Sequence, residues 1–379
     1  MPEFYRGPNY SLSVDKERRE IDVANDIARL QPDETPFSVI LMRARKKSTG
    51  TVEYTWWDSE LGSWWTQINS ETGHAATVNS LVVDDESIFA PNDVIKVPRT
   101  GEVIYVTGID EATHKITVLR GYGTTAAAAL TDNDRLMRIG NAMEEFSKAP
   151  KSKLKQPMKG YNYTQIFRTP FDQSMTGEAE NLRTTESERT RLRKDKAVDH
   201  RLDMERAFLF GERKEDINNK RRMTGGLFSF LTTNVKDCSG TPLTLAEWEK
   251  YCEMLFAYGA KKKLFVCGRK VASQINSFAA GKLETRSGEE TFGIAIKEYI
   301  SIHGTVLIVT SQTFENEYAG WGVGLEMKNI VYRPLQGRDT KLKTNIQDND
   351  ADGWKDEYFT ESGLQVRLEK THAVLKNAV

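Results

Sequence analysis

The sequence is poor in the residues that build disulfide frameworks and zinc sites. It has three cysteines and five histidines, and no cysteine stands in a C-x-x-C pair. An odd count without such pairs argues against a disulfide scaffold and favours folding in a reducing cytoplasm. The histidines are scattered and show no H-E-x-x-H spacing. We therefore expect neither a cofactor nor a metal.

Long apolar runs and an excess of one charge are also missing. No stretch approaches the roughly 20 apolar residues of a membrane span, and the polar start MPEFYRGPNYSLSVDKERRE lacks a signal-peptide core. The 53 basic and 54 acidic residues give a net charge of -1. Proteins that grip nucleic acid through its phosphates usually carry a basic excess. We expect no membrane partner and only non-specific contact with DNA.

Motifs of catalysis and phosphate binding are absent as well. There is no G-x-S-x-G elbow and no phosphate-binding G-x-x-x-x-G-K loop. Gly121-Tyr122-Gly123 lies between expected strands and indicates a turn. The acidic stretch from Asp348 to Gly353 matches the start of a calcium loop, but its twelfth position is Phe359, where a glutamate is needed. A polar loop is favoured there, and the sequence predicts no enzyme.

The length of 379 residues predicts two or three domains. Residues 1–48 are typical of an extended arm, because the expected helix at 15–29 has few apolar residues and ends before Pro32 and Pro36. Such a segment must lie on a larger surface. In it we select Tyr10, Ile21 and Phe37 as contact residues.

Tryptophans dominate the next segment, residues 49–76, with the motif TVEYTWWDSELGSWW. Neighbouring residues of a strand face opposite sides, so each of the pairs Trp56-Trp57 and Trp64-Trp65 presents a ring to both sides. Such a ribbon lies either between copies of the protein or inside one domain. We favour the intersubunit location, and the core location stays open.

Short β segments separated by turns follow, and they predict a small barrel or sandwich. The expected strands are 80–83, 94–97, 102–109, 115–119 and 135–139. After them, residues 147–171 form an extended basic stretch, for which a solvated edge is the default interpretation.

A long helix is expected from Thr185, which with Glu188 has the form of a capping box, to Phe210. Gly211 is suited to a left-handed helix end. The first half of the helix is charged, and for Arg189, Arg191, Arg193 and Lys194 we expect ion pairs that set the register between subunits.

The remaining sequence alternates helix and strand, which indicates an α/β unit followed by β structure. A second capped helix begins at Thr244-x-x-Glu247 and ends at Gly259. We expect strands at 264–267 and 305–309, a helix around 271–278, and strands within 324–335 and 356–375.

This order of segments resembles the HK-ninety-seven-like (Johnson) fold of tailed-bacteriophage shells, an α+β fold. The resemblance extends to phrases: DVANDIARLQPDETPF from Asp22, RGYGTT from Arg120, TGGL from Thr224, and DEYFTESGLQVRLEKTHAVL from Asp356. It implies an N-terminal arm at 1–48, an E-loop at 49–76 and 141–176, an inserted β domain at 77–140, a peripheral domain with the spine helix at 177–223 and 326–379, and an axial domain at 224–325.

The resemblance implies a major capsid protein that assembles in the host cytoplasm into hexamers and pentamers of an icosahedral, DNA-containing virion. Implied partners are copies of the chain, a scaffolding protein, a portal and a decoration protein. Two alternatives remain open. One is an encapsulin-type compartment shell, and the other is a carbohydrate-binding adhesion protein that uses the tryptophans as a sugar platform.

Overall fold

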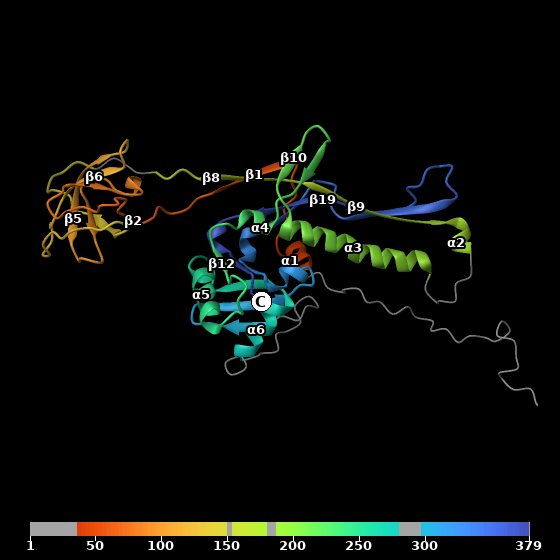
Figure 1. Ribbon diagram of the computed structural model, residues 1–379. Helices are drawn as coiled ribbons and strands as arrows, with labels where there is room; N and C mark the ends of the chain where they lie inside the picture. Colours follow the sequence, from red (N-terminus) through yellow and green to blue (C-terminus); the bar gives the residue numbers. More distant parts are fainter. Residues whose placement is uncertain (1–35, 150–153, 180–186, 280–296, 379) are drawn as a thin grey trace, which may run out of the picture. The chain divides into compact units, whose positions relative to one another are not determined.

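The computed structural model describes residues 36–149, 154–179, 187–279 and 297–378. Two compact units are present, one of Asp58–Met158 and one of Met1–Trp57 with Lys159–Val379 (Figure 1). The helix expected at 15–29 and the expected capping residue Thr185 lie outside the described residues.

A mixed six-stranded sheet is the centre of the larger unit, in the order β12-β20-β16-β13-β15-β14. Along β13, Leu264 and Val266 belong to one buried cluster, whereas Phe265 and Cys267 belong to another. The sheet is therefore buried on both faces, which explains its nearly continuous apolar strands. Its strands are β12 (Val235–Asp237), β13 (Lys262–Cys267), β14 (Lys297–Ile300), β15 (Thr305–Thr310), β16 (Gly322–Leu325) and β20 (Ala373–Lys376).

Two helices, α5 (Leu245–Phe256) and α6 (Arg269–Ala279), contribute to the cluster on one face of this sheet. The capping box predicted for α5 is confirmed, because the Thr244 hydroxyl accepts from the Glu247 amide and the Glu247 carboxylate accepts from the Thr244 amide. At the other end, the buried Lys263 ammonium donates to carbonyls of the last residues of α5 and the turn after it. Both ends of the helix thus have partners for their free backbone groups.

A four-stranded antiparallel sheet forms the rest of the core, built on the 14-residue strand β19 (Gly353–Val366). The long helix α3 (Glu188–Phe210) packs on β19 and its neighbour β9 (Figure 1). The other strands and helices of this layer are β9 (Gln165–Ser174), β17 (Ile330–Pro334), β18 (Lys341–Lys343) and α2 (Met175–Ala179).

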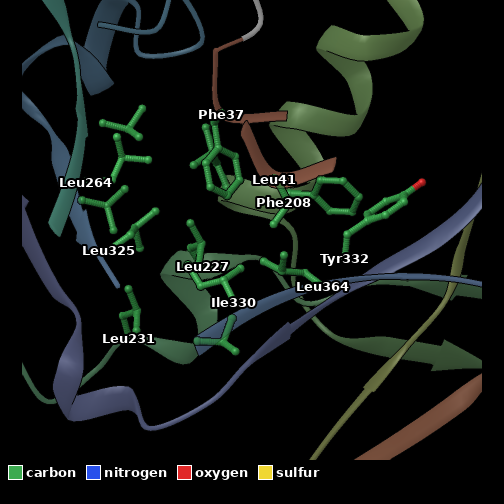
Figure 2. Close-up of a cluster of buried hydrophobic side chains, with 14 of the residues drawn as sticks. Phe37, Leu41, Phe208, Leu227, Leu231, Leu264, Leu325, Ile330, Tyr332 and Leu364 are labelled. Atoms are coloured by element: carbon green, nitrogen blue, oxygen red, sulfur yellow. The ribbon is translucent and has the colours of Figure 1, made fainter. Parts of the chain in front are cut away.

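Helix α1 (Pro36–Ala44) was not expected from the sequence, where Pro36 had been given the role of a helix stop. Proline is favoured in the first turn of a helix, since its missing amide would have no partner there. Figure 2 shows Phe37 and Leu41 of α1 in one cluster with Phe208 of α3 and Ile330 of β17. The α1 segment is therefore part of the core.

The prediction of a left-handed end at Gly211 is wrong, because this residue has a φ of −59°. Glycine is needed there for a different reason. A Cβ at Gly211 would lie 2.4 Å from the Ala207 carbonyl oxygen and 2.5 Å from the Thr224 carbonyl oxygen. The chain passes too close for any side chain. After it come the hairpin of β10 (Lys214–Asp216) and β11 (Arg221–Met223) and the short helix α4 (Leu227–Phe230).

The smaller unit is a six-stranded antiparallel sheet in the order β2-β7-β4-β5-β6-β3. A bridge between Ile68 and Val83 links the two outer strands, so the sheet closes into a barrel around its own apolar cluster. All five strands predicted for this region are confirmed, within one or two residues of their ends. The strands are β2 (Trp65–Gln67), β3 (Ser80–Val82), β4 (Asp93–Lys96), β5 (Val103–Asp110), β6 (Lys115–Leu119) and β7 (Arg135–Asn141).

The barrel also contains a buried ion pair. The Arg120 guanidinium donates to both oxygens of the Glu102 carboxylate, each over 2.8 Å, and the two side chains are almost fully buried. Burial disfavours the ionised carboxylate, but bonds from Arg120 and two backbone amides outweigh it and lower the pKa of Glu102. The pair joins β5 to the segment after β6.

Two predicted domain boundaries need correction. The compact unit begins at residue 58 rather than 77, because β2 pairs with β7 and completes the sheet. The terminal strand β20 belongs to the six-stranded sheet rather than to the predicted peripheral segment 326–379, because it pairs with β12 and β16. The two-stranded ribbon of β1 (Glu53–Asp58) and β8 (Met158–Tyr163) precedes and follows the barrel.

Candidate functional site

The first tryptophan pair is divided between the core and the surface. Trp56 is 7% exposed, and its ring lies 6.0 Å from that of Phe230 and 6.2 Å from that of Tyr54. A Cβ at Gly160 would lie 2.5 Å from the Trp56 ring, so only glycine fits beneath it. The predicted intersubunit role of Trp56 is wrong, because almost no ring surface is left for a neighbour. Its neighbour Trp57 is 59% exposed, and the intersubunit role of Trp57 stays a prediction.

The second pair belongs to the barrel unit and is half exposed. Trp64 is 56% exposed and Trp65 is 44% exposed. Trp65 lies on the outer face, directly opposite Met137 of β7, and Ile139 adds a third exposed apolar side chain to that face. An intersubunit role for Trp64 and Trp65 stays a prediction.

The charged half of α3 finds partners inside its own chain. Arg189 and Arg193 both donate to the carboxylate of Asp356, which has no exposed side-chain surface. Burial opposes ionisation of Asp356, but the bonds from Arg189, the Asn345 amide and Arg193 hold its pKa below the usual value. Ion pairs of these two arginines with neighbouring copies are thus not needed to stabilise them.

Two further basic residues lie on the same helix. Arg191 binds Glu188 and Asp195, three and four residues away, which is ordinary helix spacing. For Arg191 and Lys194, the role of setting the register between subunits stays a prediction. Of the predicted arm contacts, Tyr10 and Ile21 lie outside the described residues. Phe37 is fully buried in its own core, so its predicted contact with a neighbour is wrong.

Exposed apolar residues that the sequence did not suggest lie at the turn between β14 and β15. Ile300 is 59% exposed and Ile302 fully exposed. The available signal was the motif ISIHG, in which two isoleucines alternate with polar residues just before Gly304. An apolar surface of this kind on a turn is typical of a contact with another protein.

No metal centre is apparent in the part of the chain that the structure describes. Within it, no three His, Cys, Asp or Glu side chains are placed to hold an ion. The loop from Asp348 to Gly353 closes through its own backbone, with the Ala351 amide donating to the Asp348 carbonyl. No helix among these residues is both long enough and apolar enough to cross a bilayer.

Two solved capsid chains have the same fold as this chain. A chain of the cyanophage A-1(L) capsid matches with a TM-score of 0.53 and 10% identity, over 96% of this chain and 98% of that one. A chain from the capsid of a native GTA particle matches with a TM-score of 0.52 and 9% identity, over 96% of this chain and 97% of that one. The fold is therefore the HK-ninety-seven-like fold of phage capsids, as the resemblance implied.

Sequence comparison identifies the family of capsid proteins to which the chain belongs. The SU10 major capsid protein family matches residues 8–379, and the chain belongs to it. The major capsid protein of Pseudomonas phage PaMx41 is 35% identical over 97 residues, which are 26% of this chain. The chain spans about a quarter of the length of this relative, since the match covers 23% of it.

Proposed function

We propose that this chain is the repeating subunit of an icosahedral tailed-phage head and joins copies of itself into hexamers and pentamers around double-stranded DNA. The observation that carries the proposal is the match of a major capsid protein family to residues 8–379. The role is structural, and the chain catalyses no reaction.

Two exposed apolar sites of the larger unit support assembly through modest, separate contacts. Trp57 projects from β1 beside the buried Trp56, so its neighbour fixes the strand while its own ring remains available. Ile300 and Ile302 offer a second apolar surface at the β14–β15 turn. Contacts of this size are individually weak, which lets a misplaced subunit leave before the shell closes.

The arm is proposed as a clamp on a neighbouring copy, with Tyr10 and Ile21 as its contact residues. A segment that is ordered only against a partner loses conformational entropy at that moment, so its contact stays reversible.

Other partners follow from the same role. They are a scaffolding protein, a portal and a decoration protein, and assembly takes place in the host cytoplasm before the protein resides in the virion capsid. A net charge of -1 suits an inner wall that meets packaged DNA without binding it tightly.

Electron microscopy of the purified recombinant chain tests the proposal, and capsomers or closed shells are the expected result. Deleting residues 1–20 should leave a folded protein that assembles poorly, whereas normal shells from this variant would remove the clamp role. A full-length chain that sediments only as a monomer at high concentration would contradict the proposal itself.

A further inference from the structure

Two adjoining cavities open on the barrel unit beside β2. One has a volume of about 300 Å³ and is lined by Trp65, Gln67, Asp84, Asp85 and Arg135. The other has about 540 Å³, and Trp64, Ile88, Leu154 and Lys155 line it. Asp85 lines both cavities, so they are neighbours, and we name the two together the β2 cleft. Its volume is in the range of ligand sites.

Each half of the β2 cleft contains one indole ring. Trp64 is 56% exposed and Trp65 is 44% exposed, so about half of each ring is supported by the protein and the other half is open. An aromatic ring held in this way is a platform on which the C–H groups of a flat ligand can pack.

Free hydrogen-bonding groups stand beside Trp65. Arg135 lies opposite Gln67 in the β2–β7 pairing, and on the other side of Gln67 the Asp84 amide donates to the Gln67 carbonyl over 3.1 Å. Within the described part of the chain, the side chains of Asp84 and Arg135 form neither a hydrogen bond nor an ion pair. The β2 cleft therefore offers the Asp84 carboxylate as an acceptor on one side of Gln67 and the Arg135 guanidinium as a donor on the other side.

Charges of both signs line the β2 cleft. The carboxylates of Asp84 and Asp85 and the guanidinium of Arg135 carry opposite charges. The Arg138 guanidinium is paired with the Asp93 carboxylate over 2.7 Å, and the Lys155 ammonium lies 3.8 Å from the Glu60 carboxylate. A strongly charged ligand of either sign would meet a like charge, so a neutral ligand fits best.

Hydroxyls are neutral groups that both donate and accept hydrogen bonds. A pyranose ring combines hydroxyls at its edge with an apolar C–H face. We propose that the β2 cleft binds a neutral oligosaccharide, with sugar rings on Trp65 and Trp64 and hydroxyls bound by Asp84 and Arg135. This role goes beyond shell formation and replaces the intersubunit role predicted for the two tryptophans.

The same geometry disfavours a segment of a neighbouring chain as the occupant. An added β-strand needs a free sheet edge, but the bridge between Ile68 and Val83 closes the sheet beside β2. The smaller cavity is also lined mainly by polar side chains, since Trp65 is the one large apolar residue in its lining. An apolar peptide anchor would leave most of the polar lining without partners.

Calorimetric titration of the full-length chain with cellotriose, maltotriose and N-acetylated chitotriose, which are all neutral, tests the proposal. At least one trisaccharide should bind, and Trp65→Ala and Asp84→Asn should each weaken binding by about tenfold. Trp57→Ala is the matched control, because Trp57 is equally exposed but lies outside the β2 cleft, and its binding should be unchanged. Absence of binding by all three sugars, or an equal loss in Trp57→Ala, overturns the proposal.

Hydroxyl-radical footprinting separates this proposal from the shell function. Trp64 and Trp65 should remain reactive in assembled particles and become protected when the bound sugar is added. Protection by assembly alone would show a protein contact and overturn the sugar site, while the shell function would stand. If no particles form, the titration still tests the β2 cleft on the unassembled chain.

Discussion

Arg189, in the first turn of α3, donates from Nη2 to Oδ1 of the buried Asp356 in β19 over 2.9 Å, although 167 residues separate them in sequence. Arg193, one turn further along α3, donates to Oδ2 of the same carboxylate over 2.8 Å. The start of the longest helix is thereby bound to the longest strand by a charge pair. Removing one partner of such a pair leaves the other charge in a partly desolvated place.

Asp356→Asn should lower the free energy of unfolding of the unassembled chain by about 3 kcal/mol, because two guanidinium groups lose their anionic partner. Chemical denaturation measures this loss. Asp203→Asn on the same helix is the control, since its ion pair with Arg206 is exposed and should contribute less than about 1 kcal/mol. Equal effects of the two substitutions would contradict the role given to Asp356.

Lys263→Met should destabilise the chain by about 3 kcal/mol. Its ammonium donates to the carbonyls of Leu255, Tyr258 and Thr371 over 2.6 to 2.7 Å, and methionine fills the space but leaves these buried acceptors without a donor. Lys262→Met is the matched control, because Lys262 is largely exposed and pairs with Glu298 at the surface. Thermal unfolding of both variants checks the difference.

Gly211→Ala should destabilise the chain by about 2 kcal/mol, because the added methyl group would collide with two backbone carbonyl oxygens that cannot move independently. Gly140→Ala provides the comparison, as no atom lies within 4 Å of the position of its Cβ. Denaturation midpoints that fall equally in both variants would show that the close approach at Gly211 is not the cause.

Trp56→Ala should affect the stability of the fold, and Trp57→Ala should affect assembly. Loss of the buried Trp56 should lower the free energy of unfolding by about 3 kcal/mol, whereas loss of the exposed Trp57 should leave it nearly unchanged and reduce the yield of shells. Denaturation of the unassembled chain and sedimentation of the particles measure the two effects. Normal shell yield from a stable Trp57→Ala variant would remove its proposed contact role.

Acid should destabilise the fold through His372. Burial lowers its pKa from 6.5 to about 4. Above pH 6.5 the imidazole is neutral in both the folded and the unfolded chain, and between pH 6.5 and 4 only the unfolded chain binds the proton. The free energy of unfolding should therefore fall through this window, by about 3 kcal/mol in total from this group.

His372→Asn should flatten this pH dependence, because the proton-binding site is gone while an amide oxygen can still accept from the Glu326 amide. Burial also lowers the pKa of His200, so part of the slope should persist in the His372 variant.

Local signals predicted the elements whose stabilising contacts are also local. The capping box at Thr244 is an example, because its partner Glu247 lies three residues away. Trp56 and Trp57 show the limit of such signals. Alternation predicts opposite faces for them, but which face is buried depends on Phe230 and Gly160, more than a hundred residues away.

Contacts between residues far apart in the sequence explain the other differences between the predictions and the structure. The sequence could not show that Arg189 and Arg193 meet Asp356, so their charges indicated contacts with other subunits. Gly211 likewise had the position of a left-handed helix end, because the nearby Thr224 carbonyl is brought in only by the turn before α4. In the barrel, the two cavities that share Asp85 come from four separate segments, which no spacing along the chain reveals.

The closed barrel has a further consequence for protein engineering. Its apolar cluster shares no residue with the two clusters of the other unit, and the chain enters and leaves it through the paired strands β1 and β8. A pair of adjacent strands is a natural attachment point for a foreign module, since both ends of a graft start close together. Exchanging residues 59–157 for another compact domain should therefore leave the remaining hydrophobic interior intact.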